Sequence, residues 1–305
     1  MLFADRYRID GLLGEGGMGQ VFRAKQLALN RDVALKIIKA AFVGEREVRF
    51  SREAQLLSRL DHRGCVRIVD YGRSGKYLFI AMELVEGKSL RQAIDEGPLE
   101  PARVAHIGRE ILSALAHAHA HGILHRDIKP ENVMLGPEGR VVVIDFGLAR
   151  ALDHAPLTAN GMCYGSPSYL APERLLGGDY DERADVYAVG VLMYEALAGV
   201  RPFLGANAWE ILRSTTEPPK PLRAPPWLDK AIARAMARDP QDRFADAIEM
   251  RSALDDDPAE TMHAIEIARP TIWQRVWSRL RYGAWRWSGG SAKSVCEISS
   301  DCSSG

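Results

Sequence analysis

The chain has 305 residues, of which 47% are hydrophobic and 26% charged, and its formal net charge is zero. This composition is typical of a globular protein with a substantial core, and the balanced charge excludes a global basic field for nucleic acid. No basic segment followed by an apolar one opens the chain, and no apolar run reaches about 18 residues, so we expect neither a signal peptide nor a spanning helix. The cysteines have no paired spacing suited to zinc, which is typical of a reducing cytoplasm; they are Cys65, Cys163, Cys296 and Cys302.

Residues 6–40 predict three strands around a glycine-rich turn. The strands are expected at 7–13, 20–24 and 32–38, and the turn comprises Gly14, Glu15, Gly16, Gly17, Met18 and Gly19. Glycine lets a backbone approach phosphate oxygens without an intervening side chain, so the turn is a candidate phosphate-binding loop. The same Gly-x-Gly-x-x-Gly spacing opens dinucleotide-binding βαβ units, but these need a helix directly after the turn, whereas a strand containing Val21 follows here.

A lysine interrupts the third strand, and a carboxylate interrupts the apolar face of the helix expected after it. Lys36 lies in an otherwise apolar run, and residues 44–60 have helical periodicity that places Glu53, Leu56, Leu57 and Leu60 on one face. A cation in an apolar strand needs a partner or an escape to solvent. We therefore expect Lys36 to pair with Glu53, with a solvated Glu53 on the helix rim as the open alternative.

A hairpin and two helices come next. The hairpin is expected at 66–72 and 76–84 with its turn at Ser74-Gly75, and the helices at 89–96 and 101–121.

The second of these helices carries a histidine pair, His117 and His121, four residues apart on one face. Such a pair raises a metal site as an alternative. No carboxylate or cysteine accompanies the pair, so surface and packing roles are the preferred interpretation.

Residues 123–147 concentrate the chemistry of the chain. Asp127, Lys129, Asn132 and Asp145 fall within one loop and one short hairpin, which can bring four such side chains together. An aspartate that accepts a proton, a lysine beside it, and an amide and a carboxylate that hold a metal ion form the minimal set for phosphoryl transfer.

A long irregular segment follows at 148–172. More than 20 residues without periodicity inside a compact domain are usually functional, and this segment carries Thr158, Ser166 and Ser168. A helix expected at 181–198 is hydrophobic nearly all round, so it should lie at the centre of its lobe. Three further helices are expected near 206–214, 226–237 and 243–254.

Over residues 7–255 the chain resembles the protein kinase family. The resemblance is carried by His125-Arg126-Asp127, Asp145-Phe146-Gly147 and Ala171-Pro172-Glu173. A lysine at position 129, two residues after Asp127, makes the chain similar to the Ser/Thr branch of the family, as in bacterial Hanks-type kinases. The resemblance implies an α+β, two-lobed fold: a small antiparallel β-sheet lobe with one main helix (1–86) and a larger helical lobe (87–256).

The resemblance also implies a site for ATP and Mg²⁺, with Mn²⁺ as an alternative metal. Asp127, Lys129, Lys36 and Glu53 would be catalytic, and Asn132 and Asp145 would hold the metal. Met82 would guard the back of the adenine pocket, and backbone groups of Glu83 and Val85 would bind the adenine edge. The nucleotide-binding residues implied in all are Leu13, Gly14, Glu15, Gly16, Gly17, Met18, Gly19, Gln20, Val21, Ala34, Lys36, Met82, Glu83, Val85 and Met134.

Other residues receive structural or regulatory roles from the same resemblance. Asp185 would accept bonds from the catalytic-loop backbone, and Arg243 would pair with Glu173. Thr158 is the first candidate for a phosphate that pairs with Arg126, and Ser166 the second. An unmodified segment remains open.

The C-terminal part lies beyond the resemblance. Residues 257–287 form a basic, tryptophan-rich segment, and residues 288–305 are predicted to be disordered. Between 268 and 293 there are six cations and no acid: Arg269, Arg275, Arg279, Arg281, Arg286 and Lys293. With Trp273, Trp277, Trp285 and Trp287, this composition suits either a helix docked on the large lobe or a contact with an acidic partner or the inner membrane surface.

These observations lead to a functional hypothesis. The chain is expected to be a Ser/Thr protein kinase that transfers the ATP γ-phosphate to protein hydroxyls and phosphorylates itself, with self-association for transfer between copies. A pseudokinase scaffold and a small-molecule phosphotransferase of kinase-like fold remain alternatives, although the former usually lacks one of the key residues and the latter the Ala-Pro-Glu segment.

Overall fold

The structure is a computed structural model that describes residues 1–16, 19–39, 45–146 and 167–255. All described elements belong to one compact unit, Met1–Asp257. Residues 17 and 18, the candidate phosphorylation sites Thr158 and Ser166, and the basic C-terminal segment lie outside the described residues. The predicted boundaries within that segment remain predictions.

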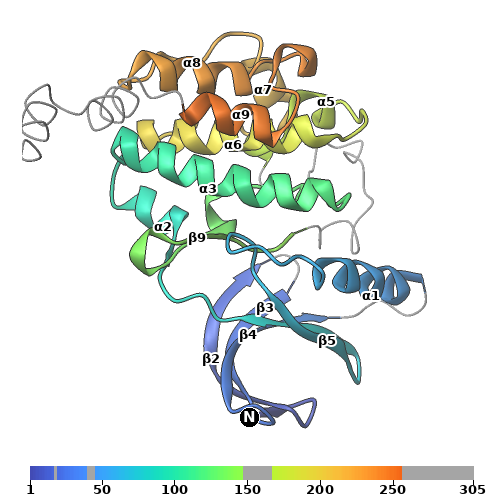
Figure 1. Cartoon of the computed structure of the whole chain (residues 1–305). Helices are drawn as coiled ribbons and strands as arrows, with labels where there is room; N and C mark the ends of the chain where they lie inside the picture. Colours follow the sequence, from blue (N-terminus) through green and yellow to red (C-terminus); the bar gives the residue numbers. More distant parts are fainter. Residues whose placement is uncertain (17–18, 40–44, 147–166, 256–305) are drawn as a thin grey trace, which may run out of the picture. The chain divides into compact units, whose positions relative to one another are not determined.

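The small lobe is built on an antiparallel sheet whose strand order is β1-β2-β3-β4-β6-β5. Figure 1 shows this curled sheet with helix α1 (Glu45–Leu57) beside it. The three predicted N-terminal strands and the following hairpin are confirmed, with strands somewhat longer than expected at the glycine turn. The strands are β1 (Leu2–Phe3), β2 (Tyr7–Gly16), β3 (Gly19–Gln26), β4 (Arg31–Lys39), β5 (Ile68–Ser74) and β6 (Tyr77–Glu83).

Alternation along β4 assigns its side chains to two different faces of the sheet. Val33 and Leu35 pack with Phe79 in one buried cluster, whereas Ala34 belongs to a second cluster on the other face. Because successive strand residues point to opposite faces, Lys36 shares the face of Ala34. The strand pattern therefore delivers the lysine to the face that looks toward the large lobe.

Helix α1 buries a stripe that differs by one position from our expectation. Phe50 and Ala54 are fully buried and Leu57 is 5% exposed. The prediction that Leu56 shares this face is wrong, since Leu56 is 44% exposed. The buried residues are spaced i, i+4, i+7, which places Leu56 about 100° around the helix from Leu57.

The large lobe is helical and organised around α6 (Glu182–Ala198), whose residues 184–196 are all buried. Helix α6 packs against α3, α8 and α9, and Figure 1 shows α3 and α6 running side by side. The expected central helix is thus confirmed. The other helices are α2 (Leu90–Asp95), α3 (Pro101–Ala120), α5 (Pro172–Leu175), α7 (Ala208–Ser214), α8 (Pro226–Ala235) and α9 (Ala247–Asp255).

A small second sheet carries the catalytic hairpin. Its strands β7 (Lys88–Ser89), β8 (Val133–Leu135) and β9 (Val141–Val143) pair in the order β7-β8-β9. Backbone bonds from Val66 N to Val143 O (3.0 Å) and from Val143 N to Gly64 O (2.8 Å) tie this sheet to the segment after α1. The hairpin is therefore held from both lobes.

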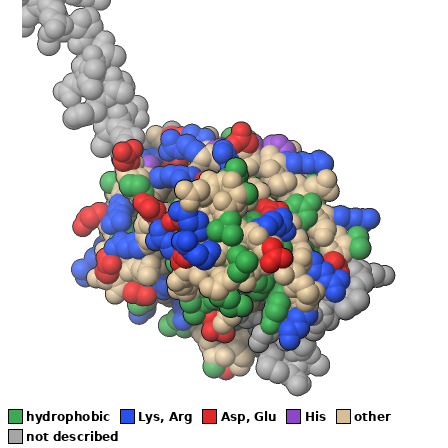
Figure 2. Space-filling view, turned by 90° about the horizontal axis from the view of Figure 1, so that it is seen from below, with side chains coloured by type: hydrophobic (Ala, Val, Ile, Leu, Met, Phe, Trp, Pro, Cys, Tyr) green, Lys and Arg blue, Asp and Glu red, His purple; other side chains and the backbone are tan. Residues whose placement is uncertain are grey.

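Charges on the outer face of the small lobe are largely paired. Arg23 contacts Asp32 at 2.7 Å and Arg6 contacts Asp70 at 2.8 Å. Figure 2 shows basic and acidic side chains interspersed on the face seen from below. Exposed pairs of this kind contribute little to stability, so hydrophobic burial must hold this lobe together.

The α1 stripe predicts a contrast between two apolar side chains of one helix. Phe50→Ala should lower the free energy of unfolding by about 3–5 kcal/mol, because it leaves a cavity between α1 and the sheet. Leu56→Ala removes a side chain that is 44% exposed and should change it by about 0.5 kcal/mol or less. Urea unfolding of both variants measures the difference; equal losses would contradict the assigned faces.

Candidate active site

Two of the predicted catalytic residues and one predicted metal ligand form a hydrogen-bonded group in the loop between α3 and β8. Lys129 Nζ donates to Asp127 Oδ2 at 2.7 Å, and Asn132 Nδ2 donates to the same oxygen at 3.0 Å. Asn132 Nδ2 also bonds the backbone oxygen of Asp127 at 2.8 Å. The amide and ammonium groups therefore hold the Asp127 carboxylate in one orientation.

The loop is anchored by a buried carboxylate on α6. Asp185 is fully buried and accepts hydrogen bonds from the backbone N–H groups of His125 (2.8 Å) and Arg126 (2.9 Å). His119 Nε2 lies 2.9 Å from its Oδ2, and the Tyr180 hydroxyl donates to its Oδ1 at 2.5 Å. Burial by itself would raise the pKa of Asp185, but the bonds from His119 and Tyr180 and the nearby imidazoles hold this pKa below its ordinary value.

Two site residues have left-handed backbone conformations. Arg126 has φ 70° and Asp145 has φ 62°. A non-glycine residue with positive φ is uncommon, and such strain persists only where the surroundings enforce it. At Arg126 the enforcing contact is its N–H bond to Asp185.

Asp145 meets the lysine of the small lobe. Lys36 Nζ lies 2.8 Å from Asp145 Oδ2, and the lysine side chain is 7% exposed. Within the described residues the structure thus shows an ion pair of Lys36 with Asp145. The Lys36–Glu53 pair stays a prediction, and the two residues that the structure joins come from different lobes.

An apolar cluster lies between the lobes at the position predicted for adenine. Ala34 and Met82 are buried there with Val142, and Val21, Val85 and Met134 pack against them. Leu13, also predicted to line the pocket, is 53% exposed. Apolar side chains of this kind suit the flat ring of a ligand such as a purine.

The glycine turn serves two different purposes. At Gly14 a side chain would meet nothing within 4 Å, so space for a ligand remains above this backbone. At Gly19, which has φ 145°, an added Cβ would lie 2.2 Å from Ile37 O. Gly19 is therefore required by the close approach of β4, a reason that the phosphate argument from sequence did not supply.

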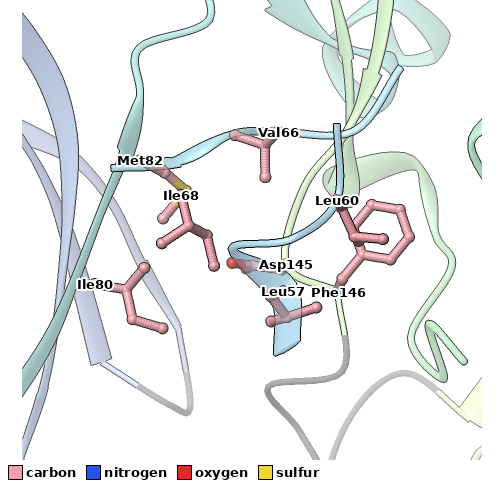
Figure 3. A pocket seen from close by; sticks show the side chains of 8 residues that line it. All are labelled: Leu57, Leu60, Val66, Ile68, Ile80, Met82, Asp145 and Phe146. Atoms are coloured by element: carbon pink, nitrogen blue, oxygen red, sulfur yellow. The ribbon is translucent and has the colours of Figure 1, made fainter. Parts of the chain in front are cut away.

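A small pocket lies behind Met82. It is lined by apolar side chains around Asp145, as Figure 3 shows. The lining residues are Leu57, Leu60, Val66, Ile68, Ile80, Met82, Asp145 and Phe146. Because α1 supplies Leu57 to this pocket, the position of α1 affects the surroundings of Asp145.

Glu173 and Arg243 form a bidentate ion pair with N–O distances of 2.8 and 2.7 Å. The Arg243 guanidinium also donates to the backbone oxygens of Ala237, Arg183 and Arg238. Its position ties α5 to the loop before α9.

Several contacts near the site had no counterpart in the sequence analysis. His119 and Tyr180 complete the shell of Asp185, and Arg91 reaches Glu195 at 2.8 Å. The position of His119, seven residues after Leu112 on the buried face of α3, would have predicted that it points inward. No sequence signal identifies Arg91, because its partner is 104 residues away.

The histidine pair behaves as packing side chains. The rings of His117 and His121 lie 4.6 Å apart between centroids, and His62 stacks on His117. Among the described residues no group of three metal-binding side chains occurs.

A divalent metal held with a nucleotide is a different case from such a cluster. Asn132 donates its amide N–H to Asp127, which leaves its carbonyl oxygen available, and Asp145 uses one oxygen for Lys36. An amide oxygen and a carboxylate oxygen are both ligands that suit Mg²⁺.

Comparison with known proteins gives the same picture. The sequence matches the protein kinase domain over residues 7–256. It is 40% identical over 263 residues to the serine/threonine-protein kinase PknL of Mycobacterium tuberculosis, covering 83% of this chain and 66% of PknL. It is 38% identical over 258 residues to PrkC of Bacillus subtilis, covering 82% of this chain and 40% of PrkC. The crystal structure of the Mycobacterium tuberculosis PknI kinase domain matches with TM-score 0.66 and 30% identity, covering 84% of this chain and 96% of that domain.

The chain belongs to the protein kinase family, among the bacterial Hanks-type Ser/Thr kinases. The expected two-lobed α+β kinase fold is confirmed, and the domain is of the kind that uses ATP and Mg²⁺. The chain spans 66% of the length of PknL and 40% of that of PrkC. In the part of the chain that the structure describes, no helix has the length and apolarity to cross a membrane.

The shell of Asp185 predicts a large effect of a single-atom change. Asp185→Asn should lower the free energy of unfolding by about 3–5 kcal/mol, because the buried donors lose their charged acceptor. The folded-state pKa of Asp185 is depressed. Its contribution should therefore be constant from pH 8 to 5 and disappear as the pH falls below about 4.

The matched control is the same change at the N-cap of α6. Asp181 accepts a bond from Arg183 N, and asparagine caps helices about as well, so Asp181→Asn should cost less than about 0.5 kcal/mol. Denaturant unfolding at several pH values measures both variants, and similar losses in the two would refute the anchoring role.

Proposed function

We propose that this chain is a Ser/Thr protein kinase that transfers the γ-phosphate of ATP to protein hydroxyls. The observation that carries the proposal is the group in which Lys129 and Asn132 both contact Asp127 Oδ2, at 2.7 and 3.0 Å. A proton acceptor with an ammonium and an amide at the same oxygen suits attack by a hydroxyl on a phosphoryl group.

The nucleotide is held from both lobes in this proposal. Lys36 contacts its phosphates, and Asn132 and Asp145 supply oxygen ligands for Mg²⁺. The metal, when bound, offsets the negative charge of the transferred group. Met82 and Val85, which already pack in one apolar cluster, enclose the adenine.

Asp127 orients the substrate hydroxyl and accepts its proton. In a loose transition state this proton leaves late. Lys129, which contacts Asp127, steadies the γ-phosphate as the new bond forms.

Self-phosphorylation of residues 148–172 is part of the proposal. Thr158 is the first acceptor and Ser166 the second, and phosphate on either pairs with Arg126. Arg126 lies near Tyr180, with its guanidinium 5.6 Å from the ring centroid. Transfer between two copies requires self-association, at least transiently.

The experiment is a phosphotransfer assay with mass spectrometry. Incubation with ATP-Mg²⁺ and a generic basic protein should yield phosphoserine and phosphothreonine, and Asp127→Asn should lower the rate by about 10²–10⁴-fold. ATP affinity should stay unchanged, because Asp127 contacts the acceptor. Wild-type rates in this variant would refute its role.

Two controls sharpen this assay. Asp61→Asn makes the same change at a side chain that is 87% exposed and should leave the rate unchanged. Wild-type enzyme should phosphorylate the inactive Asp127→Asn chain at Thr158; modification only within the same copy would contradict transfer between copies.

We further propose that residues 268–293 bind an anionic membrane surface. Six cations without an acid, interspersed with tryptophans, contribute about 1 kcal/mol per charge near such a surface. The chain should sediment with phosphatidylserine vesicles and not with phosphatidylcholine vesicles, and a triple Arg275→Glu, Arg279→Glu, Arg281→Glu variant should lose this binding. Unchanged sedimentation of the variant would refute it.

A further inference from the structure

Arg91, on α2, sits among acidic groups beside the catalytic loop. Its Nη2 donates to Glu195 Oε1 at 2.8 Å and to the Tyr169 hydroxyl at 3.0 Å. Its Nε donates to Glu131 Oε1 at 3.2 Å, and its Nη1 to Asp95 Oδ1 at 3.3 Å. One guanidinium thus serves three carboxylates that belong to different parts of the large lobe.

The carboxylates differ in burial. The Glu195 side chain is 5% exposed, whereas Glu131 is 45% exposed and Arg91 24% exposed. Tyr169 donates its hydroxyl to the second oxygen of Glu195. A buried carboxylate requires a cation, so Glu195 holds the guanidinium of Arg91 at the buried end of the cluster. Glu131 lies at the end that is exposed to solvent.

The cluster lies beside the residues that we propose bind the acceptor hydroxyl. Glu131 directly precedes Asn132, which contacts Asp127 Oδ2 at 3.0 Å, and Tyr169 lies two residues before Ala171-Pro172-Glu173. An extended peptide advances about 3.3 Å per residue, so a side chain roughly two to four residues from the acceptor hydroxyl comes within reach of Glu131.

We propose that Arg91 determines the charge preference of the enzyme toward its substrates. Its guanidinium occupies the position between Glu131 and Glu195 that a basic substrate side chain would otherwise take. With Arg91 in place, the enzyme accepts sequences without a basic residue near the acceptor. The proposal rests on the kinase function proposed above.

The sequence of the proposed acceptor segment is consistent with this preference. Between Arg150 and Arg174 the chain contains no lysine or arginine, and Thr158 lies within this interval. A substrate-binding surface that demanded a basic side chain close to the acceptor would reject this segment. An internal arginine removes that demand.

A purely structural role for Arg91 makes a different prediction. If Arg91 only joins α2 to α6, its loss lowers stability and leaves the relative rates on different peptides unchanged. The proposal requires the relative rates to change, and to change only where a substrate arginine can reach Glu131. Charge preference is therefore the decisive measurement, not activity alone.

The test uses a peptide of residues 152–162, whose only hydroxyl is that of Thr158, with one arginine placed at each other position in turn. For wild-type enzyme, kcat/KM should be nearly independent of the arginine. For Arg91→Gln, arginine at one or two neighbouring positions should raise kcat/KM about tenfold or more, as expected for a new charged hydrogen bond. The gain should lie in KM, because this contact exists before the reaction.

Two further variants serve as controls. Arg91→Lys keeps the positive charge and should keep the flat wild-type profile. Arg63→Gln makes the same change at an arginine that pairs with Glu110 at 2.7 Å and should also leave the profile flat. A flat profile for a folded Arg91→Gln enzyme, or equal gains for the glutamine and lysine variants, would overturn the proposal.

The remaining outcomes also decide the question. If Arg91→Gln does not fold, the double variant Arg91→Gln/Glu195→Gln replaces it, because it removes the buried charge together with its cation and leaves Glu131. A smaller gain in kcat/KM from arginine at the same peptide position supports the proposal. A kcat/KM that is independent of the arginine overturns it. If wild-type enzyme modifies no peptide, the kinase proposal fails separately. Methylguanidinium should then still raise the Tm of Arg91→Gln but not of wild type, and equal shifts would overturn the role of Arg91.

Discussion

The buried carboxylate of Asp185 fixes the position of the catalytic loop. A charge in the interior is tolerated only when donors surround it in a fixed geometry. Here the donors are two loop N–H groups, a histidine of α3 and the hydroxyl of Tyr180. Because α6 is the most completely buried helix of the large lobe, the loop inherits the rigidity of the core. The left-handed conformation of Arg126 follows from that attachment.

The small lobe meets this fixed base through few directional contacts. The alternation along β4 delivers Lys36 to Asp145, and Glu83 at the end of β6 pairs with Arg140 at 2.8 Å. A side chain at Gly14 would meet nothing within 4 Å, and Leu13 is exposed. A small lobe with few contacts to the rigid large lobe allows a nucleotide to enter between them. Closure of the lobes then depends on contacts that the nucleotide itself provides.

The sequence predicts faces of elements more readily than partners. Periodicity located the strands and helices, and the all-round apolar α6 is at the centre as expected. The error at Leu56 is of one helical position, because periodicity gives a stripe only approximately. The partner of Lys36 is 109 residues away and that of Arg91 is 104, and no local pattern specifies a pairing over such distances. The family resemblance predicted the roles of Asp185 and Arg243, but it predicted none for Arg91.

The number of N–H donors that already have acceptors distinguishes structural cations from cations available to a ligand. All five N–H donors of Arg243 have acceptors, two of them on Glu173. A guanidinium in that state has nothing left to offer a ligand. By contrast, an ammonium has three donors, and within the described residues Lys36 and Lys129 each show one side-chain contact, to Asp145 and Asp127. The lysines therefore retain the capacity to take phosphate oxygens, whereas the saturated arginine holds the framework in which they act.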